Sequence, residues 1–371
     1  MKWNWKQPHW PDFQWDRSKL ENIEAQFLHT SGVLDGALKH FDTQDREQVT
    51  IDLMSTEALK TSEIEGEILN RDSVQSSIRR NFGLQDSRTG IPPAEAGIAE
   101  MMVDLFKTFN EPLKHSTLFR WHEMLMNGRR DLDKVGVYRS HTEPMQIVSG
   151  YNNNLTVHFE APPSDTLQSE MDRFISWFNK TGPNSENCLP ALTRAAIAHV
   201  FFVSIHPFED GNGRIGRAIS EKCLSQTIGA PTLVALSMTI QNARQDYYKA
   251  LEENNKGLNI TDWLIYFSRT VLVAQSYSQN YVDLIIFKTK LFDRLRGQLN
   301  ERQRLFLSSL FDEGPDCIAR EIYADKYIRI TSASRATATR DLQGLVEKDV
   351  LMRAGERKAT RYFLNLPFKM Q

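Results

Sequence analysis

The stretch HPFEDGNGRIGR, residues 206–217, decides the fold of this chain. It lies between two segments with helical periodicity and combines glycines, an acid, a histidine and two arginines. Gly211, Asn212 and Gly213 tolerate positive φ, so their successive backbone N–H groups can converge on one point. The helix expected to follow directs its positive N-terminal end into the same space. The sequence therefore predicts a loop that binds phosphate.

The charged side chains of this loop have complementary uses around a polyphosphate. Arg214 and Arg217 are three residues apart and share one face of the expected helix, where two guanidinium groups can hold phosphate oxygens. Asp210 is a hard oxygen ligand suited to Mg²⁺. His206 carries the side chain best suited to accept a proton near neutral pH. Each feature alone is more often structural, but their combination favours a nucleotide site.

The loop resembles the signature of the Fic family, and every position of that signature is filled between His206 and Arg217. The resemblance covers roughly residues 51–267. It includes a predicted β-hairpin, Met145 to Val148 with Val157 to Glu160, that is similar to the family's substrate-aligning flap. It implies a mainly helical fold and an enzyme that transfers AMP from ATP to a hydroxyl group of a target protein.

The resemblance also implies a role for each residue of the loop. His206 would be the general base, and Asp210 would hold Mg²⁺ or Mn²⁺. The implied phosphate-binding residues are Gly211, Asn212 and Gly213 for the α- and β-phosphates, and Arg214 and Arg217 for the outer phosphates.

A second stretch, Tyr247-Tyr248 followed by Asn255, resembles the family's adenosine-contacting segment. The resemblance makes Tyr248 and Asn255 the expected nucleoside contacts. A Tyr-Tyr pair on an amphipathic helix is otherwise typical of core packing. The preference for ATP over other nucleotides rests on the resemblance, because a phosphate-binding loop does not contact the base.

Residues 61–66, TSEIEG, match the family's inhibitory pattern of Ser or Thr, three residues, Glu, then Gly or Asn. Thr61 and Glu65 share one helical face. In the family this glutamate pairs with the second arginine of the signature, here Arg217, because a carboxylate competes with phosphate for the same guanidinium. The resemblance implies an autoinhibited enzyme that also modifies itself when released, and Glu65 could assist in removing AMP. The alternative is an ordinary exposed glutamate.

The C-terminal segment from Leu299 onward has a different texture. Three helical patterns precede two strand-like runs around the charged turn 354–358, which is the outline of a winged helix. Residues Arg329 to Arg361 include eight Lys and Arg and four Asp and Glu, which gives this segment a net charge of +4. Both DNA binding and a plain protein-interaction module fit this segment. The competing hypothesis for the whole chain is a DNA-binding transcriptional regulator that uses the Fic pocket as a nucleotide sensor.

The expected fold class is mainly α: a Fic-fold helical bundle with a β-hairpin flap, followed by a small α+β winged-helix domain. We expect a Trp-rich strap and helical region with the inhibitory helix in 1–95, a Fic catalytic core in 96–275, a connecting helix in 276–298 and the winged helix in 299–371. We also expect one long helical pattern from near Asp262 to Gly297 that contains a break. Four of the seven tryptophans lie in the first sixteen residues. Side chains of this size are seldom left in water, so we expect an extended strap packed on a neighbouring domain rather than an exposed partner site.

Composition excludes several classes of protein. The 371 residues include 45 Lys and Arg against 47 Asp and Glu and are 40% hydrophobic, which excludes wholesale disorder and a polybasic whole-chain role. Cys188, Cys223 and Cys317 follow no CxxC spacing, which argues against a disulfide framework or zinc ribbon. His122-Glu123 begins like a zinc-protease motif, but Met126 stands where a second histidine is needed. The sequence shows no signal-peptide or membrane segment, so we expect a cytoplasmic protein. The expected partners are ATP, a target protein and a second copy of the chain in a homodimer; under the alternative hypothesis the chain also binds DNA.

Overall fold

The computed structural model describes residues 3–84, 90–149, 156–315, 321–355 and 359–367. The chain divides into two compact units: the first comprises Met1–Asp35 and Thr50–Gln275, and the second comprises Gly36–Val49 and Ser276–Gln371. Helices predominate in the described residues, which confirms the predicted mainly α class. None of the helices described is both long and apolar enough to cross a membrane.

The described helices are α1 (Glu21–Lys39), α2 (Thr43–Ile64), α3 (Arg71–Asn81), α4 (Pro93–Thr108), α5 (His115–Leu125), α6 (Leu167–Lys180), α7 (Ala191–Ile205), α8 (Asn212–Ile228), α9 (Leu236–Asn242), α10 (Arg244–Asn254), α11 (Thr261–Arg294), α12 (Glu301–Asp312), α14 (Ala324–Thr331) and α15 (Arg335–Glu347). The described strands are β1 (Gln146–Ser149), β2 (Thr156–Glu160), β3 (Leu351–Ala354) and β4 (Arg361–Leu364).

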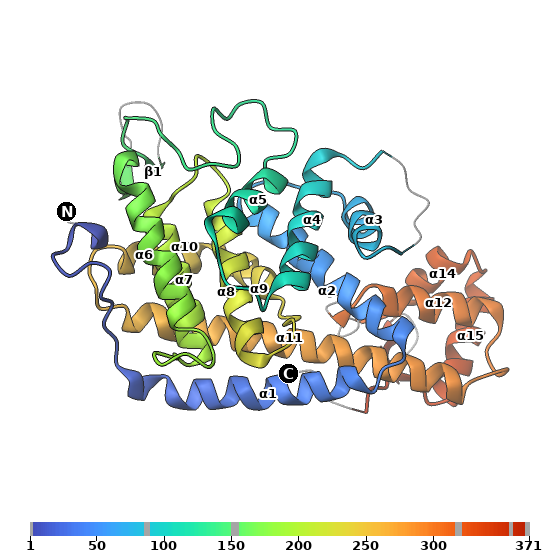
Figure 1. The fold of residues 1–371 in the computed structure, drawn as a ribbon. Coiled ribbons are helices and arrows are strands. Elements are labelled where there is room, and N and C mark those ends of the chain that lie inside the picture. The colour runs from blue at the N-terminus through green and yellow to red at the C-terminus, as the bar shows by residue number, and fades with distance from the viewer. Residues whose placement is uncertain (1–2, 85–89, 150–155, 316–320, 356–358, 368–371) are drawn as a thin grey trace. The chain divides into compact units, whose positions relative to one another are not determined.

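Helices α7 and α8 pack side by side at the centre of the first unit (Figure 1). All but one residue of α7 are buried, as expected for a helix that is apolar on nearly every face. Gly216 lets the two helices approach closely, because a Cβ there would lie 3.1 Å from Val203 Cγ1. The first turn of α7 is capped from α1, where Glu24 accepts hydrogen bonds from the N–H groups of Leu192 and Thr193 at 3.0 and 2.7 Å. These contacts hold rigid the helix that leads into residues 206–217.

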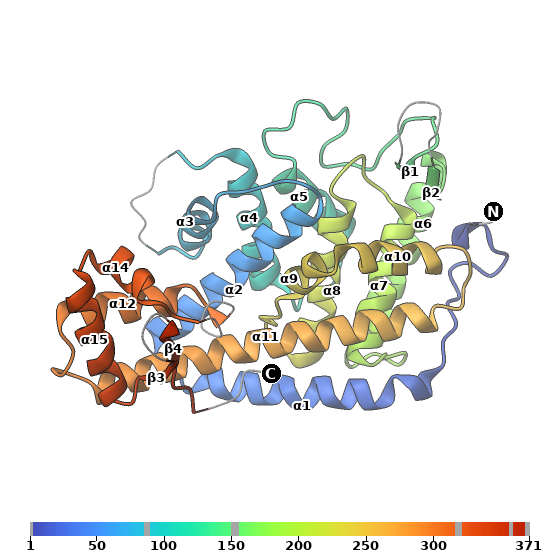
Figure 2. The ribbon, with the colours of Figure 1, turned by 180° about the vertical axis from the view of Figure 1, so that it is seen from behind.

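The predicted hairpin is present as the antiparallel pair β1–β2, with Gln146 opposite Glu160 and an irregular register after Ile147. The hairpin and α10 lie side by side (Figure 2), joined by a hydrogen bond of 2.9 Å between His158 Nδ1 and Glu252 Oε2. The predicted turn between the strands lies outside the described residues from Gly150 onward.

The tryptophan-rich N-terminus packs on the first unit, as predicted. Trp3 and Trp10 are both buried, and their rings make edge contacts with Phe159 at 5.4 Å and Phe201 at 5.2 Å between centroids. The segment is not extended throughout, because residues Asn4–Lys6 form a short 3-10 helix.

The helix α11 differs from the prediction. The sequence predicts a break in the helical pattern between Asp262 and Gly297, whereas α11 is one continuous helix of 34 residues. No proline or glycine occurs within it, so no residue interrupts its backbone hydrogen bonds.

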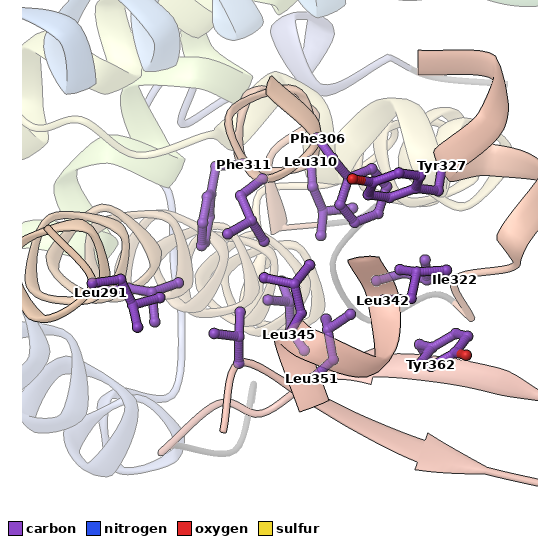
Figure 3. Close-up of a cluster of buried hydrophobic side chains, with 14 of the residues drawn as sticks. Leu291, Phe306, Leu310, Phe311, Ile322, Tyr327, Leu342, Leu345, Leu351 and Tyr362 are labelled. Carbon is purple, nitrogen blue, oxygen red and sulfur yellow. The ribbon is translucent and has the colours of Figure 1, made fainter. Parts of the chain in front are cut away.

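The second unit has its own apolar core (Figure 3). It is built by α12, α14, α15 and the antiparallel pair β3–β4, in the order expected from the sequence. Its fully buried side chains include Phe306, Leu310 and Leu342. Inside this core Asp341 accepts hydrogen bonds from Tyr327 Oη at 2.9 Å and from Arg302 Nε at 2.8 Å. The tip of the predicted β3–β4 turn, residues 356–358, lies outside the described residues, and the winged helix stays a prediction.

Candidate active site

The loop at residues 206–217, here called the signature loop, is held by its own side chains. Helix α7 ends at His206, which adopts left-handed backbone geometry with φ 52°, and Gly211 precedes α8 with φ 82°. The buried amide of Asn212 bonds both backbone groups of Phe208, at 2.8 Å to its oxygen and 3.0 Å from its nitrogen. The side chain of Asn212 is therefore used within the loop, and only its backbone is left for a ligand.

His206 has the tautomer that a general base needs. Its Nδ1 lies 3.3 Å from the carbonyl oxygen of Val203. A carbonyl only accepts hydrogen bonds, so Nδ1 carries the hydrogen and Nε2 keeps a lone pair. Burial, followed by the guanidinium of Arg139, lowers the pKa of His206 to about 4. The imidazole is therefore neutral at physiological pH.

A cavity of about 740 Å³ lies beside the loop, within the size range of small-ligand sites. Five of the residues singled out from the sequence line it: Glu65, His206, Gly213, Tyr248 and Asn255. Residues of the hairpin line it too, among them Ile147, Val148 and His158. The cavity thus brings together the signature loop, the expected flap and the expected nucleoside contacts.

Both arginines of the signature loop are covered by carboxylates. Arg217 donates from Nη2 to Glu65 Oε1 at 2.7 Å and from Nε to Thr61 Oγ1 at 2.7 Å. Arg214 donates from Nη1 to Glu67 Oε2 at 2.8 Å. Both guanidinium groups are almost completely buried. Residues 61–67, here called the acidic segment, therefore place one carboxylate on each arginine.

The Glu65 carboxylate also occupies the space above the start of α8. A Cβ added to Gly213 would lie 2.2 Å from Glu65 Oε1. The N-terminal turn of a helix attracts anions through its free N–H groups and its dipole. Glu65 therefore stands where an anion bound to the signature loop would lie.

Asp210 is held by cations in the described structure. Its Oδ2 accepts from Arg129 Nη1 at 2.8 Å, and Oδ1 lies 3.4 Å from Arg214 Nη2. Burial opposes ionisation of this carboxyl, but Arg214, the Gly211 N–H and Arg129 outweigh it and hold its pKa below the usual value. The Asp210 carboxyl is therefore ionised and can bind a cation.

The donor set fits a magnesium ion that is shared with a ligand. Within the described ranges no group of three or more His, Cys, Asp or Glu side chains is placed to hold a metal ion. Mg²⁺ is commonly held by one or two carboxylates together with phosphates and water. A single ionised carboxylate, Asp210, beside the turn at residues 211–213 would meet that requirement once its contact with Arg129 is exchanged for the ion.

Both tyrosines of the Tyr-Tyr pair line the cavity, but they differ in exposure. Tyr247 is buried, and its hydroxyl lies 2.8 Å from His199 Nε2. Tyr248 is 40% exposed and lines the cavity, with its hydroxyl 3.4 Å from the Ile64 oxygen. Asn255 donates from Nδ2 to the His158 oxygen of β2 at 3.1 Å. Both expected nucleoside contacts therefore lie at the cavity, and Asn255 also anchors the hairpin.

Sequence reasoning missed three residues of the site. Glu67 stands two positions after Glu65, a spacing that could have drawn attention. His122, considered only as part of a metal motif, instead stacks on Phe208 with ring centroids 4.2 Å apart. Arg139 reaches the carbonyl oxygen of His206, and no pattern in the sequence points to it.

Comparison with solved structures defines the fold. A Fic family protein from Desulfovibrio desulfuricans G20 superposes with a TM-score of 0.53 at 18% identity, over 96% of this chain and 98% of that one. A Fic domain containing signaling protein from Bacteroides thetaiotaomicron superposes with a TM-score of 0.50 at 15% identity, over 70% of this chain and 97% of that one. The described fold thus belongs to the class of helical Fic folds.

Sequence comparison finds family matches for two parts of the chain. Residues 112–224 match the Fic/DOC family, and residues 3–84 match a domain of unknown function, DUF4172. The first match includes the signature loop and agrees with its resemblance to the Fic family. Two similar relatives are named protein adenylyltransferase Fic.

The relative from Nematostella vectensis is 29% identical over 34% of this chain, and the one from Drosophila mojavensis is 32% identical over 32%. The matched part spans only 28% and 22% of the length of those relatives.

Proposed function

We propose that this protein is an autoinhibited protein adenylyltransferase that transfers AMP from ATP to a Ser, Thr or Tyr hydroxyl of a protein. The observation that carries the proposal is the position of His206. His206 and Gly213 line the same cavity, and the Nε2 atom of His206 keeps its lone pair because Nδ1 donates to the Val203 oxygen. The names of the relatives support the same activity. The target protein would be bound from outside, and the chain itself would serve as a target when no other is present.

In this proposal each residue has a defined task. Nε2 of His206 accepts the proton of the target hydroxyl while the hydroxyl oxygen attacks the α-phosphorus of ATP. The new P–O bond forms as the bond to the β-phosphate breaks, and pyrophosphate leaves. The backbone of residues 211–213 and the arginines Arg214 and Arg217 hold the phosphates. Asp210 would hold the Mg²⁺ or Mn²⁺ that accompanies ATP, and the ion would neutralise phosphate charge.

The brake in this proposal is the acidic segment, residues 61–67. Glu65 and Glu67 occupy the two guanidinium groups that would otherwise hold phosphate oxygens. ATP could bind in a productive position only after these carboxylates leave. Glu65 lies beside Gly213 of the loop, where its carboxylate could activate a water that attacks the phosphorus of the protein–AMP bond. That bond breaks, the target hydroxyl is restored and free AMP leaves, so removal of AMP is part of the same proposal.

Labelling with two forms of ATP tests the activity. The purified chain is incubated with Mg²⁺ and ATP labelled at the α- or the γ-phosphate, as wild type, Glu65→Gly, and Glu65→Gly with His206→Ala. We expect α-label on protein in Glu65→Gly, little in wild type, and none in the double variant. Label from γ-labelled ATP would indicate phosphorylation instead. No α-label in a Glu65→Gly variant that binds ATP would contradict the proposal.

A DNA-binding regulator is the second candidate, favoured by the exposed face of α15. Ser334 caps this helix, and Arg335 and Arg340 are exposed on it; Arg353 of β3 is exposed too. Such a face suits contact with DNA phosphates. Retention on DNA that weakens as salt rises and is lost in Arg335→Ala with Arg340→Ala would support this candidate; equal retention by that variant would exclude it.

A further inference from the structure

Arg139 is a buried cation that bridges two parts of the site. It is 2% exposed and lies between α5 and β1. Its Nε donates to the His206 oxygen at 2.8 Å, and its backbone N–H donates to the Pro207 oxygen at 2.9 Å. On its other side, Nη2 donates to the Pro162 oxygen at 2.6 Å and Nη1 to Ser164 Oγ at 3.0 Å. One guanidinium therefore joins the signature loop to the segment that follows β2.

This arrangement is unusual for a buried charge. Buried arginines are normally paired with carboxylates, because an unpaired buried charge is costly. Among the described residues none forms an ion pair with Arg139, and burial alone lowers its pKa to about 10. The cation is held by carbonyl and hydroxyl oxygens instead. A neutral side chain would avoid the cost of burial if the only task were to fill this space.

The bridge acts on a residue whose backbone needs outside support. His206 has φ 52°, a conformation that residues other than glycine seldom adopt and that persists only where the surroundings impose it. Arg139 binds both the His206 carbonyl and the carbonyl that follows it. The same side chain grips the exit of the hairpin at Pro162.

We propose that Arg139 is a positioning residue that sets the His206 imidazole at a fixed distance from the β1–β2 hairpin. This inference rests on the proposed AMP transfer, in which the hairpin aligns the target hydroxyl and His206 accepts its proton. Misplacement of a catalytic group by about 1 Å can cost about a hundredfold in rate. The bridge therefore affects the chemical step rather than the binding of ATP.

The charge of Arg139 adds a second, measurable effect. The charged groups that influence His206 are Arg139, Glu65 and Asp210; the guanidinium favours the neutral imidazole, and the two carboxylates favour the protonated one. Replacing Arg139 by a neutral residue should therefore raise the pKa of His206. In a Glu65→Gly background the guanidinium is opposed only by Asp210, so this shift should be easy to detect.

The test compares variants in the Glu65→Gly background. We expect Arg139→Gln to lower kcat for AMP transfer about a hundredfold, with KM for ATP changed less than about twofold. The acid limb of the pH–rate profile, and the His206 titration followed by NMR, should both move to higher pH. Arg139→Lys should keep the titration near that of the parent while kcat stays low, because an ammonium cannot span both sides. Arg120→Gln, which removes an arginine paired with Asp104, should leave all three readouts unchanged.

The outcomes separate the two proposals. If the Glu65→Gly parent transfers no AMP, the proposed function fails; if the parent transfers AMP and Arg139→Gln matches it within about threefold, the role of Arg139 fails. A loss of kcat with an unchanged titration and an equal loss of thermal stability would also overturn it, since that pattern indicates structure alone. If the Arg139→Gln variant does not fold, Ser164→Ala replaces it in the test. This variant removes the hydroxyl that accepts from Arg139 Nη1 and leaves the guanidinium in place. We then expect a several-fold loss of kcat at unchanged KM, and no loss would overturn the proposal.

Discussion

The two units of this chain bury different kinds of side chain. The first unit buries charged groups beside the signature loop, including Arg139, Arg214 and Arg217. In the described part of the second unit, the charged side chain that is buried is Asp341, in a core that is otherwise mostly apolar. Burying charge is unfavourable unless it is paired, so a unit that concentrates charge inside does so for a purpose other than packing. The comparison separates residues that serve chemistry from residues that serve stability.

The largest effect we expect is the loss of AMP transfer in His206→Ala. General base catalysis contributes about a hundredfold to ten-thousandfold to a rate, so transfer in the Glu65→Gly background should fall by that factor. ATP binding measured by calorimetry should persist, because the phosphate-binding groups remain. The exposed His29 on α1 gives a matched control, and His29→Ala should leave the rate unchanged. If His206→Ala kept the rate of the Glu65→Gly parent, the base would lie elsewhere.

The second unit should respond through stability. Leu342 is completely buried in its core, so Leu342→Ala should lower the free energy of unfolding by about 2–5 kcal/mol. Leu305 on α12 is 53% exposed, and the same substitution there should cost far less. Urea denaturation measures both. Equal costs for the two variants would show that this core is not packed as described.

Release of the brake should have an intermediate effect. Glu65→Gln with Glu67→Gln should raise AMP transfer at low ATP concentration by at least about tenfold, because each hydrogen bond to a charged group contributes about 1.5–3 kcal/mol and each 1.4 kcal/mol is tenfold. Each single variant should have part of this effect, since each frees one arginine. Glu63→Gln is the matched control, because its carboxylate pairs with Lys60 instead. If Glu67→Gln alone behaves as wild type, only Glu65 acts as the brake.

The smallest effect concerns pH and stability in the first unit. Burial lowers the pKa of His122 to about 4, below the usual value of 6.5. As the pH falls below 6.5 the unfolded chain binds a proton that the folded chain does not, so the stability of the fold decreases. Acidification from pH 7.5 to 5.5 should therefore lower the free energy of unfolding by about 1.4 kcal/mol through this residue, the energy equivalent of one pKa unit.

Thermal unfolding of wild type and His122→Asn at the two pH values isolates this effect. The variant should lose less stability on acidification than wild type, whereas His29→Asn should lose as much. Equal losses in wild type and His122→Asn would mean that His122 is not held neutral in the folded state.

Local features of the fold followed from local residues. Helical periodicity predicted α7 and α8, and the glycines of the signature loop predicted the turn between them. The β-forming runs around residues 145–160 predicted the hairpin. The break predicted between Asp262 and Gly297 is wrong. No proline or glycine lies within α11, so its sequence contains no residue that would interrupt the helix.

The candidate site could be only partly predicted. His206, Asp210 and Glu65 were singled out because each belongs to a short motif. Glu67 and Arg139 were not, because their partners are far away in the chain: Glu67 reaches Arg214 across 147 positions, and Arg139 reaches His206 across 67.

The sequence by itself determined the turn that can hold phosphate and the histidine beside it, because backbone conformation and helix ends depend on residues within a few positions. Only the tertiary structure decided which carboxylates cover the arginines and which buried cation supports the histidine. Such contacts depend on how distant segments pack, and no local pattern encodes the distance between them.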